Sequence, residues 1–90
     1  MNKRHQLTID QLTEAINSVV EKLECRVGQK GLGSMASSHE ILGILTDELA
    51  EFRDEVHQKS GADRKVAELI DVAVAAIFGI ASIKSGGVDW

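Results

Sequence analysis

The feature that most constrains the fold is a long apolar stretch, residues 69–83, whose only charged residue is Asp71. Coiled into a helix, this stretch would carry apolar side chains on almost every side, so other helices should surround it. Its uninterrupted apolar part, residues 72–83, is much shorter than the roughly 20 residues that cross a bilayer. We therefore expect the core helix of a soluble protein, with no membrane association.

Apolar residues at helical spacing predict a first helix over about residues 8–26. Residues 27–38 contain three of the eight glycines and are expected to form a flexible loop. Residues 85–90 begin with Ser-Gly-Gly, which favours the end of a helix followed by a C-terminal tail. The chain has no proline and only three aromatic residues, which agrees with an all-α fold. We expect residues 1–90 to form a single domain.

Two further helices are expected after the loop. The second should begin near Ser38, because Ser37 and Glu40 have the spacing of a capping box, and should run to about Gln58. The third follows a short break and runs to about Lys84, with Ser60 or Asp63 as its N-cap.

The lengths of the two connections predict how the helices are arranged. The short second link makes the last two helices an antiparallel hairpin, to which the N-terminal helix is added. Three helices of one chain cannot easily surround the apolar third helix, so we expect the protomers to assemble into an oligomeric helical bundle, a dimer or a tetramer.

Four acidic residues on the hairpin form the candidate metal site. Glu48 and Glu51 are three positions apart on the second helix, and Glu68 and Asp71 are three apart on the third. The sixteen residues between the pairs can bring both to one level of the hairpin. Clustered carboxylates repel one another, and hard cations such as Mg²⁺ or Mn²⁺ relieve that repulsion. Alternatively, the acids are solvated or paired with bases, and Asp71 is a satisfied buried polar residue.

The overall charge restricts the partners. A formal net charge of −4 argues against a nucleic-acid interface, which needs bases that neutralise phosphates. The first ten residues include basic residues without an apolar run after them, so we expect a cytoplasmic protein rather than a secreted one.

The two acidic pairs, in the segments ILTDELAEFRDEV and KVAELIDVAVAAI, resemble the signature of the MazG-like all-alpha nucleoside triphosphate pyrophosphohydrolases. The resemblance covers residues 39–83, about half of the chain. It implies a helical bundle of at least two chains, with Mg²⁺ held by the matching Glu48, Glu51, Glu68 and Asp71. It also implies hydrolysis of a nucleoside triphosphate to a monophosphate and pyrophosphate, with Glu48 or Glu51 as the base that activates water.

The chain departs from that family pattern in two places. Asp47 stands where relatives often have a glutamate, and Ala75 and Phe78 stand where many carry polar or basic residues that contact substrate. Three bases elsewhere are candidates for substrate contacts. These are Lys65, His39 and Lys30. The apolar positions leave two alternatives open: a catalytically degenerate nucleotide-binding relative, or a helical protein-interaction module.

Overall fold

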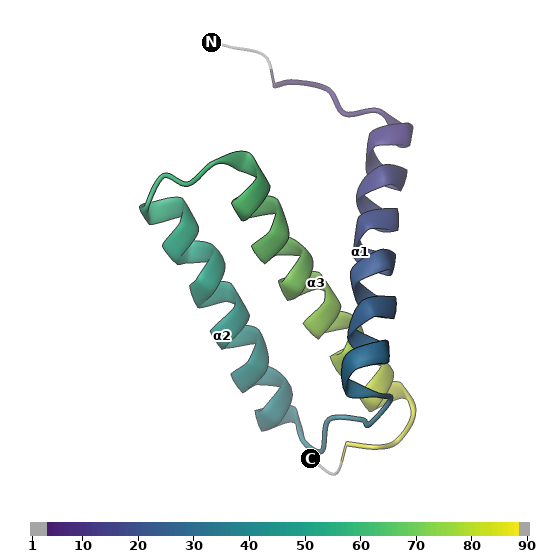
Figure 1. Ribbon diagram of the computed structural model, residues 1–90. Helices are drawn as coiled ribbons and strands as arrows, with labels where there is room; N and C mark the ends of the chain where they lie inside the picture. The colour runs from purple at the N-terminus through teal and green to yellow at the C-terminus, as the bar shows by residue number, and fades with distance from the viewer. Residues whose placement is uncertain (1–3, 89–90) are drawn as a thin grey trace.

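The computed structural model describes residues 4–88, which form three α-helices and, within that range, no strand (Figure 1). Helix α1 spans Ile9–Lys30, α2 spans Ser38–His57 and α3 spans Ala62–Lys84. The prediction of an all-α chain with three helices is confirmed. Helices α2 and α3 run antiparallel as a hairpin, as their short connection predicts, whereas α1 runs in the same direction as α3 (Figure 1).

Helix α3 is the central element. It packs against both α2 and α1, whereas no Cα atom of α1 lies within 8 Å of a Cα atom of α2 in the described part of the chain. The N-terminal part of α1 extends away from the hairpin, so the molecule is elongated, with extents of 48 × 29 × 27 Å (Figure 1). One chain therefore covers α3 on two sides and leaves the rest of its circumference open.

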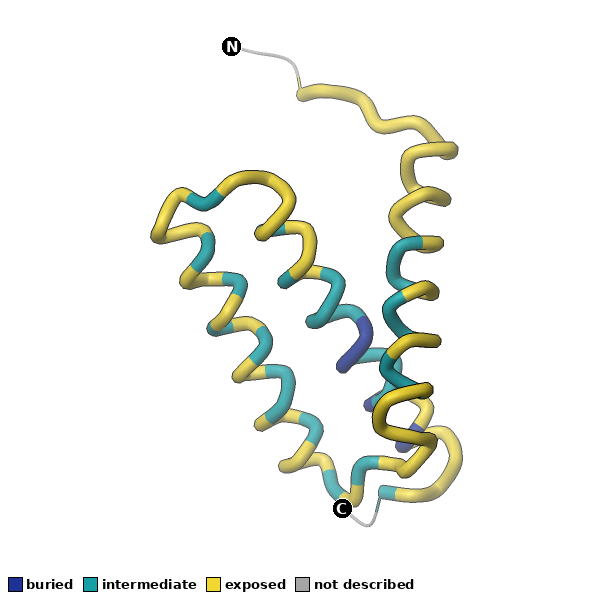
Figure 2. Tube along the Cα trace, viewed as in Figure 1, coloured by how far each residue is buried: buried dark blue, intermediate teal, exposed yellow. Residues whose placement is uncertain are grey.

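The core is small and lies entirely on α3. Within residues 4–88 the buried helical residues are Val74, Ala75, Gly79 and Ser82 (Figure 2). Helix α2 lies close to α3 at Gly79, where an added Cβ would lie 2.9 Å from the Cγ2 atom of Ile41. The absence of a side chain at Gly79 therefore sets how close the start of α2 lies to α3.

Many apolar side chains remain exposed. On α1 the apolar stripe that the sequence predicts lies mostly in solvent, and Ile16 is 61% exposed. On α3, Leu69 and Ile80 are about half exposed as well. By length and composition, α3 as a whole is apolar enough to cross a membrane, a property shared by core helices of soluble proteins. A lone protomer thus leaves uncovered much of the apolar surface that its sequence needs to bury.

Helix α1 ends later than its sequence predicts. It continues through Gly28 to Lys30, so the first part of the expected loop, residues 27–38, is helical. The helix tolerates one internal glycine at a cost of about 1 kcal/mol relative to alanine. It ends where Gly31 adopts a φ of 81°, which favours glycine. The expected tail, residues 85–90, follows α3 as predicted, and its last two residues lie outside the described part.

The helix starts follow capping chemistry in two of three cases. At α1 the Thr8 hydroxyl accepts the Gln11 N–H, and the Gln11 side chain accepts the Thr8 N–H, completing a capping box. At α2 the Ser37 hydroxyl accepts the Glu40 N–H at 3.1 Å, as predicted. The Glu40 carboxylate accepts the N–H of Ala36 rather than that of Ser37, so the second half of this box is displaced by one residue.

The predicted N-cap of α3 is wrong. Gly61 occupies the N-cap position and makes no side-chain capping hydrogen bond. The Ser60 hydroxyl instead donates to the Glu55 carboxylate at 2.8 Å, and Asp63 lies in the first helical turn, two positions after the N-cap.

The loop between α1 and α2 is anchored rather than free. The backbone N–H of Met35 donates to the Ser82 hydroxyl at 2.9 Å, and that hydroxyl donates to the Phe78 carbonyl at 2.7 Å. Ser82 is one of the few buried residues, so this contact holds the loop against the C-terminal half of α3. The loop thereby forms one wall of the pocket described next.

Candidate metal centre

Three acidic side chains converge between α2 and α3. Glu68 and Asp71 lie one turn apart on α3 and share a face, and the antiparallel hairpin brings Glu48 of α2 to the same level. One carboxylate oxygen of each of the three lies within 4.8 Å of those of the other two. Glu51, the fourth predicted ligand, is not a member of this group. The structure thus brings together three of the four predicted ligands.

Each of the three acids has an oxygen without a hydrogen-bond partner. These buried atoms are Oε2 of Glu48, Oε2 of Glu68 and Oδ1 of Asp71, and none has such a partner within residues 4–88. Buried polar atoms are almost always hydrogen-bonded, and a buried carboxylate oxygen without a donor is costly unless a proton or a cation satisfies it. Three converging acids that each hold such an atom are a donor set suited to a hard divalent cation.

The electrostatics of the cluster agree with this. Burial raises the pKa of Glu48 above its ordinary value, and the negative charges of Glu51 and Asp71 raise it further. Burial and the same two neighbours also raise the pKa of Glu68. Glu51 itself is exposed, one turn after Glu48 on α2, yet close enough for its charge to act on both residues. Without a cation, Glu48 and Glu68 therefore hold a proton more readily than an ordinary glutamate, whereas a cation would favour their charged forms.

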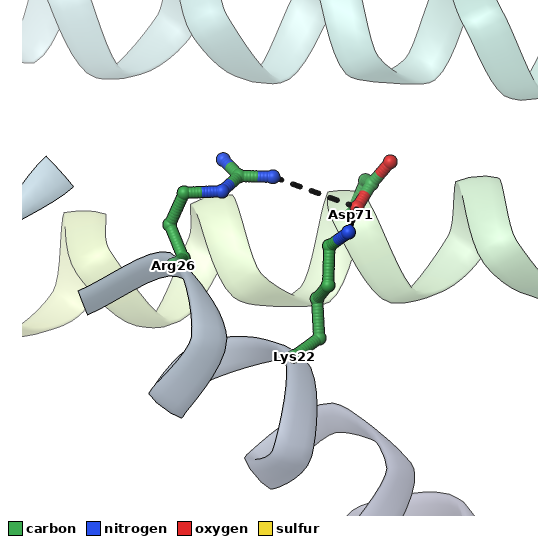
Figure 3. Close-up of polar contacts among 3 residues, drawn as sticks. All are labelled: Lys22, Arg26 and Asp71. Carbon is green, nitrogen blue, oxygen red and sulfur yellow. Dashed lines mark ion pairs between the residues drawn. The ribbon is translucent and has the colours of Figure 1, made fainter. Parts of the chain in front are cut away.

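Asp71 also faces two bases of α1 (Figure 3). Nζ of Lys22 lies 3.9 Å from Oδ1 of Asp71, and a guanidinium nitrogen of Arg26 lies 3.7 Å from the same oxygen. Both distances exceed the 2.7–3.2 Å of an N–H···O hydrogen bond, so the bases attract the carboxylate by charge without closing a hydrogen bond to that oxygen. In the absence of a cation, α1 partly neutralises the lone charge of the apolar stretch of α3, residues 69–83.

A pocket of about 320 Å³ opens beside the acids. Glu48 lies in its wall, together with Asp47 from the same helix. Arg26 from α1 lines it too, and Ala75 and Phe78 from α3 contribute apolar surface. The two apolar positions that depart from the family pattern therefore belong to the wall of this pocket.

The three predicted substrate contacts differ in their placement. Lys30 lines the pocket, which follows from the extension of α1 to that residue. His39 is exposed at the start of α2, and Lys65 lies one turn before Glu68 on α3. Neither of these two lines the pocket.

Sequence reasoning missed the two bases that face Asp71. Lys22 and Arg26 are four positions apart and therefore lie on one face of α1, which is a recognisable pattern. That pattern becomes informative only when the crossing of α1 over α3 is known, because the two bases lie more than 40 residues from Asp71 in sequence.

No family model matches this chain, and neither a curated protein nor a solved structure matches it.

Proposed function

We propose that this chain is the subunit of a magnesium-dependent hydrolase that cleaves a nucleoside triphosphate to a nucleoside monophosphate and pyrophosphate. The observation that carries the proposal is the convergence of Glu48, Glu68 and Asp71, each with a buried oxygen that lacks a hydrogen-bond partner in the described chain. The resemblance of the two acidic motifs to those of MazG-like pyrophosphohydrolases supports the same reaction.

The donor set fits Mg²⁺, with Mn²⁺ as the alternative. All three converging donors are carboxylate oxygens, which these hard cations prefer, and the group contains neither sulfur nor imidazole. Bound by Glu48, Glu68 and Asp71, Mg²⁺ would neutralise phosphate charge and orient the phosphates for attack by water. Binding would also satisfy the three oxygens that have no hydrogen-bond partner in the described chain.

Glu51 is the residue that we assign as the base. It lies beside the three acids but is exposed and outside the converging group, so it is accessible to water. In the proposed reaction Glu51 accepts a proton from water as the water oxygen bonds to phosphorus. The bond between the alpha and beta phosphates breaks, and pyrophosphate leaves. Glu48, which the sequence suggests both as a metal ligand and as the base, then serves as a metal ligand.

A homo-oligomeric bundle is part of the proposal. The exposed apolar side chains on α1 and α3, such as Ile16 and Leu69, form surface that a second copy would bury. Since α3 is packed on only two sides within one chain, further helices have room to contact it.

One observation favours the second candidate, a helical interaction module without catalysis. Lys22 and Arg26 already supply positive charge to Asp71, so this carboxylate does not strictly require a cation. The apolar Ala75 and Phe78 agree with either this module or a degenerate nucleotide-binding relative.

A pyrophosphate-release assay tests the proposal. The wild-type protein should release pyrophosphate from at least one member of a panel of ribo- and deoxyribonucleoside triphosphates, and only when Mg²⁺ or Mn²⁺ is present. Glu51→Gln should reduce turnover by about 10²–10⁴-fold, the usual contribution of a positioned base, while Mn²⁺ binding persists. Asp71→Asn should lose both turnover and Mn²⁺ binding.

Asp54→Asn is the matched control, because Asp54 is an exposed acid of α2 that pairs with Arg53 at 3.7 Å, outside the cluster. It should retain full activity. Absence of turnover for every nucleotide with both cations would reject the enzyme and leave the interaction module and the degenerate nucleotide-binding relative.

A further inference from the structure

Arg26 lies where the metal centre meets the pocket. Its guanidinium is 3.7 Å from Oδ1 of Asp71, and the same side chain lines the 320 Å³ pocket that Glu48 also lines. The side chain is 24% exposed, so it is largely desolvated but open on one side. Arginine carries five N–H donors in a planar fork, a geometry that suits phosphate oxygens. Its ion pair with Asp71 does not close a hydrogen bond to Oδ1.

Lys30 places a second positive charge in the same wall. It follows Arg26 by four residues, which puts both on one face of the last two turns of α1. Both side chains line the pocket, and Gly31 and Gly33 of the following loop line it beside them. Without side chains at these two positions, a ligand can approach the backbone closely.

The α3 wall of the pocket is apolar and includes Val74 and Phe78, whereas α2 contributes Ile44 beside the acids Asp47 and Glu48. A ligand that fills this pocket therefore needs charged oxygens near α1 and an uncharged part near α3. A nucleotide has this division, with phosphates at one end and a planar base at the other that can stack on an aromatic ring.

We infer that Arg26 and Lys30 form an anion-binding site on the α1 wall of this pocket, which takes the phosphate groups of the ligand. We further infer that Arg26 exchanges Asp71 for phosphate when a divalent cation joins Glu48, Glu68 and Asp71. The identity of the ligand as a nucleotide rests on the proposed function, but the anion site itself does not. Electrostatics supports the exchange, because a cation beside Asp71 repels the guanidinium and satisfies the carboxylate at once.

Lys22 provides the matched control. It pairs with the same oxygen of Asp71 at 3.9 Å, but it lines a different depression, together with Cys25 and Ala67. Removing its charge affects the metal centre as removal of Arg26 does, while the α1 wall of the first pocket keeps both of its bases.

The test uses inorganic tripolyphosphate as the probe, titrated calorimetrically into the full-length protein with saturating Mg²⁺. Arg26→Gln and Lys30→Gln should each weaken its binding about tenfold or more, which corresponds to the loss of a charged hydrogen bond. Lys22→Gln should change it less than threefold. A separate titration of Mn²⁺ without anion should show tighter binding in both Arg26→Gln and Lys22→Gln, because each frees Asp71 from a competing base.

Equal weakening of tripolyphosphate binding in Arg26→Gln and Lys22→Gln would overturn the inference, because the effect would then be one of general charge. So would the absence of tripolyphosphate binding to the wild-type protein. These outcomes are independent of turnover. If tripolyphosphate binding depends on Arg26 but no pyrophosphate is released from any nucleotide, the proposed function is wrong and the inference stands. If the protein releases pyrophosphate but its binding of tripolyphosphate does not depend on Arg26, the inference is wrong and the proposed function stands.

Discussion

At the scale of single residues, the surroundings of Asp71 in the structure differ from the apolar residues that flank it in the sequence. It is the only charge within an otherwise uncharged stretch of α3, and it faces two acids and two bases. The spacing of the acids could be predicted from the sequence, because Glu68 and Asp71 lie one turn apart and a hairpin fixes the level of Glu48. The bases could not, because their position depends on how α1 crosses α3, and the glycine-containing loop before α2 leaves that crossing undetermined.

The raised pKa values of Glu48 and Glu68 predict an unusual dependence of stability on pH. Above pH 4.5, the ordinary pKa of a glutamate, the folded chain holds protons that the unfolded chain has released. The free energy of unfolding of the metal-free protein should therefore fall as pH rises from 4.5 through the raised pKa values, and then level off. Urea unfolding in EDTA across pH 4–8 measures this slope.

The control for that slope is a double variant, Glu48→Gln with Glu68→Gln, which should flatten it and raise the stability of the metal-free protein at pH 7. Saturating Mg²⁺ should offset the fall in the wild-type protein, since the cation binds the deprotonated carboxylates and its affinity rises with pH over the same window. A metal-free slope that is the same in the wild type and the double variant would contradict the buried, repelling cluster.

At the scale of elements, the hairpin is fixed by close packing at one glycine. The start of α2 was predictable from Ser37 and Glu40, and the end of α1 was not, because Gly28 looks like a helix terminator but lies inside the helix. The role of Gly79 was hidden as well. In sequence it is one small residue in an apolar run, and only the approach of Ile41 shows why a side chain does not fit there.

Gly79→Ala should therefore destabilise the protein although alanine favours helices. The new methyl group would lie 2.9 Å from Cγ2 of Ile41, and overpacking of this kind costs about 1–3 kcal/mol, more than the gain of about 1 kcal/mol in helix propensity. Gly43→Ala is the matched control, because that position is inside α2 with nothing within 4 Å of the added atom. It should stabilise by about 0.5–1 kcal/mol. Chemical denaturation distinguishes the two, and a stabilised Gly79→Ala variant would mean that the helices are further apart.

At the scale of the whole molecule, we propose that the chain is one part of a larger bundle. The sequence predicted that an apolar third helix needs neighbours on all sides, and one protomer supplies two of them. The number of copies in the bundle follows neither from the sequence nor from the fold of one chain, because it depends on which exposed faces fit one another.

The apolar stripe of α1 should be the surface that holds copies together. Replacing Leu12 and Ile16 by lysine puts two charges on that stripe and should convert the proposed oligomer to a monomer with a lower unfolding temperature. Sedimentation velocity over a range of protein concentrations measures the change. Leu32→Lys is the control, because Leu32 is 81% exposed in the loop, away from the stripe, and should leave the assembly intact. A wild-type protein that stays monomeric at high concentration would refute the assembly.

The measurement that tests the central claim most directly is a calorimetric titration of Mn²⁺ into the wild-type protein and into Glu68→Gln, Asp71→Asn and Asp54→Asn. The account predicts saturable binding of Mn²⁺ to the wild type and to Asp54→Asn, displacement by Mg²⁺, and loss of at least tenfold in affinity in the two cluster variants. Equal binding by all four proteins, or no saturable binding by the wild type, would contradict a metal centre built from Glu48, Glu68 and Asp71.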